Sequence, residues 1–347
     1  MAFLNLHKKK ILFAVCLSLF FLPAAGTAPA QEVGQSYALL IGGSGGSEEY
    51  SSKYQLFLLE SRKALIENFQ FPEQNVIVLA ESRSEEEDFV TDISRAENIR
   101  AQFAALSKKV TKNDHVYIIL FGHGTYDGKN SKFNIPGLDL KDTDFAELVG
   151  TFDANRVVFI NTTELSFSFI GAMSAENRII ITATRSNAQR YETRFPEYFV
   201  EALSTPESDL DKNGDLSLLE VFKYASEKTA RWFEAENHVP TEHSLLEDTG
   251  DKMPFRVEEL EANAEGNLAA ATYLKRRAAV FAATMSSAKD SAIVKLLLEQ
   301  ERIELEISAL KSKKNQYTEE GYYEQLEVLL VQLALINDEI DKIKENL

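Results

Sequence analysis

Cysteine is almost absent from this chain. The 347 residues include one cysteine, Cys16, and it lies in an apolar run close to the N-terminus. If processing removes that run, the mature protein contains neither a thiol nor a disulfide. The sequence therefore excludes a disulfide-stabilised fold, and it leaves the processed chain without a cysteine nucleophile.

Basic residues are also scarce. The chain has 37 Lys and Arg residues against 54 Asp and Glu residues, which gives a formal net charge of -17. Three of the lysines, Lys8, Lys9 and Lys10, belong to a leader without acidic residues, so the remainder carries -20. Phosphate binding requires clustered Lys and Arg. The composition therefore argues against nucleic acid and anionic membranes as partners.

A long hydrophobic run is missing as well. The apolar segment at 11–22 is too short to span a bilayer comfortably. Basic residues precede it, and Ala28 and Ala30 form an A-x-A cleavage pattern before Gln31. We predict that residues 1–30 are a secretory signal peptide and that the protein is secreted or periplasmic, with no other membrane association. An uncleaved N-terminal anchor is the alternative.

Beyond the leader, apolar strand patterns alternate with helical patterns. Hydrophobic residues make up 44% of the chain, enough for one large core and an appendage. Helical periodicity covers 54–70 and 94–110. Nearly continuous apolar runs, typical of strands covered on both faces, lie at 36–43, 75–80, 115–122, 156–161 and 178–184. The alternation predicts an α/β domain over 31–257, with a mostly parallel sheet flanked by helices.

A glycine-rich segment follows the first predicted strand. It does not have the G-x-G-x-x-G order of a dinucleotide-binding loop, because Glu48 stands where the third glycine would be. No G-K-[ST] sequence follows it either. We therefore assign no nucleotide site here and expect the glycines to allow a tight turn beside a cleft.

His123 directly follows the strand predicted at 115–122, between Gly122 and Gly124. An imidazole can act as a general acid or base near neutral pH, although a single histidine at a strand end more often forms only structural hydrogen bonds. The next strand, 156–161, also ends in an unusual polar and bulky loop. Two candidate elements are therefore expected to meet at one edge of the sheet.

The order of these segments resembles the legumain-type cysteine peptidase family, which has a caspase-like fold, and in particular its exported bacterial members. The segments IILFGHGTYDGK, FNIPGLDL, RVVFINTTELSFSFI, IIITATRS and RFPEYFVEAL carry the resemblance over about residues 36–250. It implies that His123 matches the catalytic histidine. The position of the family's catalytic cysteine falls at Glu164, and a small glycine position of the family holds Phe167.

These departures lie at the chemical centre of the resemblance. A glutamate is not a substitute for a thiolate: it would repel an oxyanion and pair with a protonated His123. A bulky Phe167 would also hinder the backbone approach that an oxyanion hole needs. The resemblance therefore predicts an inactive homologue, a pseudo-peptidase that acts by binding a peptide or protein partner.

The alternative is an active peptidase in which His123 activates a hydroxyl group. Ser166 is the first candidate nucleophile. A shift of the register by one or two residues would give further candidates, namely Thr162, Thr163 and Ser168. Each needs a well-placed base, since a free hydroxyl is almost wholly protonated at neutral pH.

An independent motif lies at 209–220, DLDKNGDLSLLE, and matches every position of the twelve-residue EF-hand loop, with Gly214 at the sharp turn. The expected ligands are Asp209, Asp211, Asn213, Asp215 through its backbone carbonyl, Ser217 directly or through water, and Glu220. Hard oxygen ligands in a flexible loop imply Ca²⁺, with the affinity of an unpaired extracytoplasmic site. A helix cap that binds no metal is the alternative.

The composition changes after about residue 258. We predict an alanine-rich connector over 258–290 and a helical hairpin or coiled coil over 291–347. The polar segment 314–323 separates the two predicted helices. In the last one, apolar residues recur at both positions of a heptad seam: Leu326, Leu329, Leu333, Ile336, Ile340, Ile343 and Leu347. The hairpin either folds back on itself and the main domain, or presents a seam for self-association or for another protein.

Overall fold

The computed structural model describes residues 33–83, 88–284 and 288–344. The predicted signal peptide at 1–30 lies outside the described residues. Among the described helices, none combines the length and the apolar character that crossing a membrane requires.

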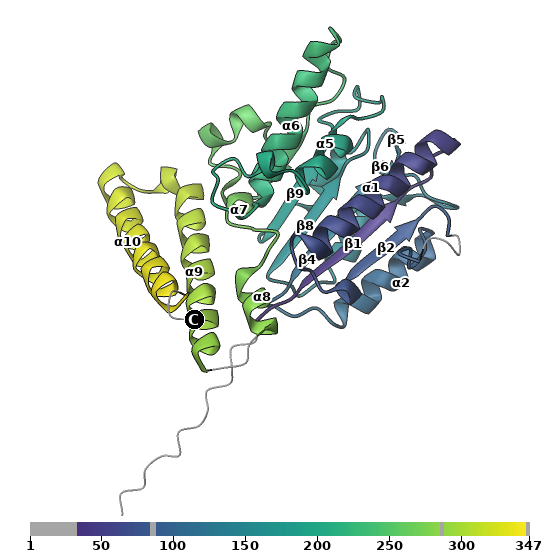
Figure 1. Cartoon of the computed structure of the whole chain (residues 1–347). Coiled ribbons are helices and arrows are strands. Elements are labelled where there is room, and N and C mark those ends of the chain that lie inside the picture. Colours follow the sequence, from purple (N-terminus) through teal and green to yellow (C-terminus); the bar gives the residue numbers. More distant parts are fainter. Residues whose placement is uncertain (1–32, 84–87, 285–287, 345–347) are drawn as a thin grey trace, which may run out of the picture. The chain divides into compact units, whose positions relative to one another are not determined.

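A seven-stranded sheet forms the centre of the main domain, with the strand order β10-β9-β8-β4-β1-β2-β3 (Figure 1). All neighbours pair in parallel except β10, which is antiparallel to β9. The strands are β1 (Ser36–Gly42), β2 (Val76–Ala80), β3 (Asp92–Ile93), β4 (His115–Phe121), β8 (Arg156–Asn161), β9 (Arg178–Thr182) and β10 (Leu245–Glu247). The predicted α/β fold class, with a mostly parallel sheet flanked by helices, is confirmed.

The five predicted strands are all present, with ends within two residues of the expected ones. Every residue of β4 and β8 is buried, because helices cover both faces of the sheet. The two short edge strands β3 and β10 were not predicted, since two or three residues are too few to show a periodicity. A small antiparallel sheet, β5 (Gly124–Tyr126), β6 (Ser131–Phe133) and β7 (Leu140–Lys141), follows β4 and was also not predicted.

Two sets of helices cover the two faces of the sheet. One face carries α1 (Glu48–Glu67), α5 (Phe195–Ala202) and α6 (Leu218–Ala235). The other carries α2 (Ala96–Ser107), α3 (Asp142–Val149) and α4 (Ser168–Met173). Helix α1 begins six residues earlier than predicted, because its first turn is polar and is started by the Ser47 cap, whose hydroxyl accepts a hydrogen bond from the backbone N–H of Tyr50.

The chain leaves β1 in one direction to form β2, and it returns to the opposite side of β1 to form β4. In open parallel sheets, a crevice at the carboxyl ends of the strands lies where the strand order reverses in this way. The loop after β1 and the loop that carries His123 both begin at this point. The topology therefore gives His123 the usual position of a functional residue.

The core continues past the expected domain boundary at 257, because Leu260, Ala269 and Leu274 are buried in it. The connector contains α7 (Asn267–Ala270) and α8 (Arg277–Ala283). Short 3₁₀ helices occur at Glu73–Asn75, Pro206–Ser208, Val257–Glu259, Glu261–Asn263 and Lys314–Gln316.

Two long helices, α9 (Ala288–Ser312) and α10 (Glu319–Lys344), form the predicted C-terminal hairpin (Figure 1). The hydrogen bond between the side chains of Gln300 and Asn337, 3.0 Å long, links them near mid-length. The turn lies at 313–318, so Gly321, which was expected to be in it, is inside the first turn of α10.

The face of the sheet that α2, α3 and α4 cover is filled by aromatic rings. Phe145 of α3 is fully buried. Its ring centroid lies 5.5 Å from that of Phe159 and 5.9 Å from that of Phe169. The side chain of Phe145 therefore packs α3 against both β8 and α4.

We expect Phe145→Ala to lower the free energy of unfolding by about 3–5 kcal/mol, because it leaves a cavity among rigid neighbours. Urea unfolding followed by the fluorescence of Trp232, the only tryptophan, measures this. The control Leu138→Ala removes a side chain that is 81% exposed and should change stability by less than about 0.5 kcal/mol. A loss below about 1 kcal/mol for Phe145→Ala would contradict this account of the core.

Candidate functional site

Two of the predicted site residues lie at the carboxyl ends of neighbouring strands. His123 follows the end of β4 by two residues, and Glu164 follows the end of β8 by three. Strands β4 and β8 pair in parallel, with Leu120 opposite Asn161. The loops that follow them therefore start side by side at one edge of the sheet.

The side chains of His123 and Glu164 bind each other. The imidazole Nδ1 lies 3.0 Å from Glu164 Oε1, and Glu164 is buried. The hydrogen bond to Glu164 raises the pKa of His123, against the lowering effect of burial. The pair therefore favours a protonated imidazole held by a carboxylate.

The second ring nitrogen of His123 is also engaged. Its Nε2 lies 3.1 Å from the hydroxyl oxygen of Tyr54, a residue of α1 whose pKa is raised by burial. The ring of Tyr50, also from α1, meets the imidazole edge-on at a centroid distance of 4.8 Å. Both nitrogens of the imidazole thus have partners within the protein.

A polar network holds Tyr50 in this position. Its hydroxyl donates to Glu192 Oε2 at 3.0 Å, and Glu192 in turn binds Lys53 Nζ at 2.5 Å. Sequence reasoning missed Tyr50, Tyr54 and Glu192, since they lie far from His123 in the sequence. The spacing of the two tyrosines on one face of α1 was the only available signal.

The glycines beside His123 allow backbone segments to approach closely. A Cβ atom on Gly124 would lie 2.2 Å from the carbonyl oxygen of Glu164, and one on Gly122 would lie 3.0 Å from the Cα atom of Gly43. Small neighbours do not leave the imidazole open to solvent here. In the structure only 22% of the His123 side chain is exposed, and the glycines bring the loops after β1 and β8 against the His123 loop.

The candidate hydroxyl nucleophiles are hydrogen-bonded within their own surroundings. Ser166 is fully buried, and its Oγ lies 3.0 Å from Thr184 Oγ1. Thr162 Oγ1 donates to Leu120 O at 2.7 Å, Thr163 Oγ1 donates to Asn161 Oδ1 at 2.8 Å, and Ser168 Oγ donates to the Asp142 carboxylate. Among the hydrogen bonds of the described residues, His123 binds none of these four hydroxyls.

The loop after Glu164 also uses the backbone donors that an oxyanion would need. The N–H of Leu165 donates to Gln189 O at 3.2 Å, and the N–H of Ser166 donates to Thr184 Oγ1 at 2.9 Å. Leu165 has a φ of 56°, a left-handed conformation that is uncommon for leucine. This backbone is fixed in a turn whose two N–H groups point to protein acceptors.

Phe167 lies beside the loop as an aromatic contact. Its ring centroid is 5.4 Å from that of Tyr126 in β5, and both side chains are partly exposed. Phe167 therefore forms a small aromatic surface with Tyr126, next to the His123 and Glu164 pair.

The acidic loop at 209–220 brings three carboxylates together. Oxygen atoms of Asp209, Asp211 and Glu220 all lie within 4.8 Å of one another. Gly214 has a φ of 85°, and its N–H donates to Asp209 Oδ2 at 2.9 Å. The turn at Gly214 folds the loop back around the carboxylates, an arrangement that suits a hard cation.

Glu220 is anchored at the start of α6. Its Oε2 accepts hydrogen bonds from the Ser217 N–H at 2.8 Å and the Ser217 Oγ at 2.7 Å, which form a capping box. Asn213 donates from its side-chain amide to Asp211 Oδ2 at 2.9 Å, and the Asp215 carboxylate pairs with Arg277. Ser217, Asn213 and Asp215 thus lie in the loop with their side chains bound to protein groups. The pairing with Arg277 leaves the backbone carbonyl of Asp215 as the group expected to bind a cation.

The acidic loop is joined to the connector that leads to the hairpin. The N–H of Leu274 donates to Leu216 O at 3.0 Å, and the N–H of Leu218 donates to Thr272 O at 2.9 Å. Together with the ion pair between Asp215 and Arg277, the first residue of α8, these bonds fix the loop to the segment before α8 and to the start of that helix. Nothing in the sequence pattern indicated this pairing.

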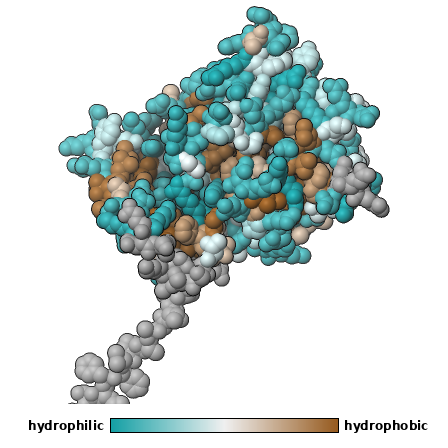
Figure 2. Space-filling model, viewed as in Figure 1, coloured by the Kyte–Doolittle hydropathy of each residue, from teal (hydrophilic) through white to brown (hydrophobic). Residues whose placement is uncertain are grey.

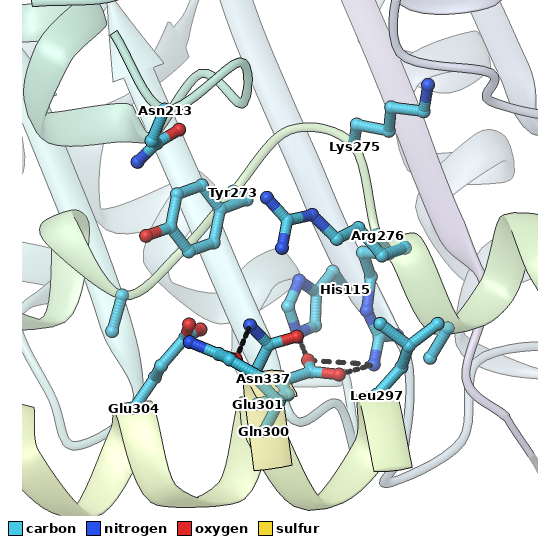
Figure 3. A pocket seen from close by; sticks show the side chains of 13 residues that line it. His115, Asn213, Tyr273, Lys275, Arg276, Leu297, Gln300, Glu301, Glu304 and Asn337 are labelled. Atoms are coloured by element: carbon cyan, nitrogen blue, oxygen red, sulfur yellow. Dashed lines mark hydrogen bonds and ion pairs between the residues drawn. The ribbon is translucent and has the colours of Figure 1, made fainter. Parts of the chain in front are cut away.

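A polar cavity of about 240 Å³ lies between the start of β4, the connector and α9 (Figure 3). Burial lowers the pKa of His115, which lines it, well below the usual range. Arg276 binds Glu301 of α9 at 3.0 Å, and burial raises the pKa of Glu304 to about 7. Both guanidinium groups that line the cavity are paired, Arg276 with Glu301 of α9 and Arg277 with Asp215 of the acidic loop.

Comparison of the sequence with protein-family models gave no match, and comparison with curated proteins also gave none. The resemblance to the legumain-type family therefore depends on the quoted segments.

We expect Glu164→Gln to lower the free energy of unfolding by about 1–2 kcal/mol near pH 6, because it removes the charge that the His123 cation binds. The folded-state pKa of His123 is raised above the unfolded value, which is about 6.5. The stabilisation is therefore complete below the unfolded pKa and is lost as the pH rises through the folded pKa. Urea unfolding of both proteins between about pH 6 and pH 9 measures the difference.

The matched control is Glu67→Gln, which removes the charge of an exposed carboxylate in the last turn of α1. Its effect on stability should not change over this pH range. A Glu164→Gln effect that stays constant or grows with pH would show that the imidazole is not the group bound by Glu164.

Proposed function

We propose that this protein is an exported pseudo-peptidase of the caspase-like, legumain-type kind, which acts by binding a peptide or protein partner. The observation that supports this most directly is the occupation of both His123 nitrogens, by Glu164 at Nδ1 and by Tyr54 at Nε2. A general base removes the proton of the group that its ring nitrogen contacts, and at Nε2 that group is the phenol of Tyr54. The imidazole therefore joins Glu164 to Tyr54, and neither of these contacts is to a candidate hydroxyl nucleophile.

The active alternative receives less support from the same region. Ser166 is buried against Thr184, and the N–H groups of Leu165 and Ser166 have protein acceptors. A carboxylate, that of Glu164, stands where the resemblance places the nucleophile. Negative charge that develops on a substrate carbonyl would be repelled here rather than stabilised.

The partner surface that we propose lies beside this hydrogen-bonded chain, at the point where the strand order reverses. Tyr126 and Phe167 are partly exposed there and touch each other. Rigid aromatic side chains supply much of the binding energy in protein interfaces. The net charge of -17 favours a partner without strong negative charge.

We expect the protein to bind members of a random peptide library displayed on phage without cleaving them. Phe167→Ala should weaken the selected peptides at least about tenfold, since it removes an aromatic contact from the surface. Isothermal titration calorimetry measures the affinity, and mass spectrometry of the incubated peptides detects cleavage. The control Val239→Ala, at a residue that is 82% exposed elsewhere in the chain, should leave the affinity unchanged.

Two outcomes would overturn this function. One is peptide cleavage that His123→Ala abolishes, together with labelling of one of the four hydroxyls by a fluorophosphonate probe. The other is the absence of any selected peptide whose binding depends on Phe167.

We further propose that the loop at 209–220 binds Ca²⁺ as a structural ion. Asp209, Asp211 and Glu220 would supply carboxylate oxygens, Asp215 its backbone carbonyl, and Asn213 and Ser217 the remaining protein oxygens. The convergence of three carboxylates supports this assignment, because such groups repel one another unless a cation lies between them. The bonds from Leu216 and Asp215 to the connector would extend the stabilisation to the segment before α8.

We expect Ca²⁺ to raise the free energy of unfolding by about 2.7 kcal/mol at a concentration 100 times its dissociation constant. Asp209→Asn should abolish most of this gain, because it removes a charged ligand but keeps an acceptor for the loop N–H groups. Thermal unfolding with Ca²⁺, with Mg²⁺ and with EDTA measures the effect. Slower hydrogen exchange at the Leu218 and Leu274 amides in Ca²⁺ should accompany it.

Asp153→Asn is the matched control, since Asp153 is exposed and lies outside the loop. An equal gain in stability for Asp209→Asn and the unmodified protein would show that the ion binds elsewhere.

A further inference from the structure

Two buried carboxyl groups face each other where the connector meets the edge of the main sheet. Asp248 directly follows β10, and Glu265 lies between the 3₁₀ helix at Glu261–Asn263 and α7. Figure 2 shows hydrophilic residues over much of the visible surface, which is where carboxyl groups usually lie. Asp248 and Glu265 are instead only 5% and 4% exposed. We call these two residues the carboxyl pair.

The two members of the carboxyl pair bind each other directly. The N–H of Asp248 donates to Glu265 Oε1 at 2.6 Å, and the two side chains also form a hydrogen bond. A hydrogen bond between two carboxyl groups needs a proton on one of them, because two carboxylates contain acceptors only. The contact therefore includes a shared proton.

The side chain of Asp248 also holds the start of α7. Its Oδ1 accepts a hydrogen bond from the N–H of Gly266 at 2.9 Å, and its Oδ2 accepts one from the N–H of Ala269 at 2.8 Å. Gly266 precedes α7 with a φ of 82°, a conformation that favours glycine. Because α7 packs on both α6 and α9, the carboxyl pair joins the last strand of the sheet to the segment that supports the hairpin.

The charged groups around the carboxyl pair are mostly acidic. Glu247 of β10 and Asp251 of the following loop add negative charge near Glu265. Arg156, at the start of β8, is a buried cation that interacts with Asp248 at longer range. In the described part of the chain the Arg156 guanidinium donates to the Asn177 side chain, at 3.2 Å, and to neither member of the pair.

This environment favours the protonated pair. Burial raises the pKa of Glu265 to about 8, and the neighbouring carboxylates act in the same direction. Burial also raises the pKa of Asp248. An exposed carboxyl group loses its proton near pH 4. The folded pair therefore keeps one proton near neutral pH, and loss of that proton leaves two buried carboxylates that repel each other.

We propose that the carboxyl pair is a pH-sensitive switch, which holds the connector on the end of β10 while its two side chains share a proton and releases the connector when that proton is lost. Release of α7 weakens the attachment of α9 to the main domain, because these two helices pack on each other. The pair lies outside the acidic loop and the His123 region, so the switch requires neither the proposed ion nor the proposed peptide.

Native-state hydrogen exchange tests the switch at the Gly266 and Ala269 amides. Opening releases the shared proton, so the protection factors of these amides should fall about tenfold for each pH unit between about pH 6 and pH 8. The fall should level off above about pH 8, where the closed pair has also lost its proton. The Val158 amide in β8 reports global unfolding and should stay more strongly protected at every pH. EDTA in all samples excludes a contribution from Ca²⁺.

Glu265→Gln is the decisive variant. Its side-chain amide keeps the shape and a donor for Asp248 but has no proton to lose, so the dependence of the two protection factors on pH should disappear. The matched control is Glu261→Gln, which removes an exposed carboxylate of the same connector and should leave that dependence unchanged. Circular dichroism at pH 6 establishes that both variants fold.

The unmodified protein provides a second measurement that does not depend on how a variant folds. The carbon-13 NMR signal of the Glu265 carboxyl group should titrate at about pH 8 in the folded protein, compared with about pH 4.3 for an unperturbed glutamate.

Four results would overturn the proposal. They are titration of Glu265 at its unperturbed pH, protection factors of Gly266 and Ala269 that do not change with pH, an unchanged pH dependence in Glu265→Gln, and protection of these amides equal to that of Val158. The last result would mean that the connector opens only when the whole domain unfolds.

Discussion

His123 and Glu164 meet because β4 and β8 pair in parallel, and the chemistry of the site follows from that pairing. Two loops that begin at the same edge of a sheet must share a small space, and Gly124 provides it by allowing the Glu164 backbone to approach. A carboxylate beside an imidazole then fixes the charge and the orientation of the ring. That contact engages Nδ1, and Tyr54 engages Nε2, so both nitrogens of the ring have partners within the protein.

The polar groups around His123 are hydrogen-bonded within the protein. An oxyanion hole needs backbone N–H groups that are free to bind a substrate oxygen. Here the turn at Leu165 is retained, whereas its N–H groups, the nearby hydroxyls and the imidazole all have protein partners. The aromatic contact of Tyr126 with Phe167 lies at the margin of this hydrogen-bonded region.

The acidic loop and the hairpin extend the main domain in a single chain of contacts. Residues 209–220 pair through Leu216 with the connector, and Arg276 of the connector binds Glu301 of α9. The acidic loop and α9 are consequently held by the same connector.

Local patterns were enough to predict the five long strands, helices α1 and α2 and the hairpin, because each of these depends on periodicity within a short segment. The motif of the acidic loop was also recognisable from its spacing alone. The sequence also identified His123 and Glu164 as residues at the ends of neighbouring strands. Only the tertiary structure decided that Tyr54 binds His123, that Ser166 is buried against Thr184, and that the loop pairs with the connector. These contacts join residues far apart in the chain, and their formation depends on how the sheet orders its strands, which no local pattern encodes.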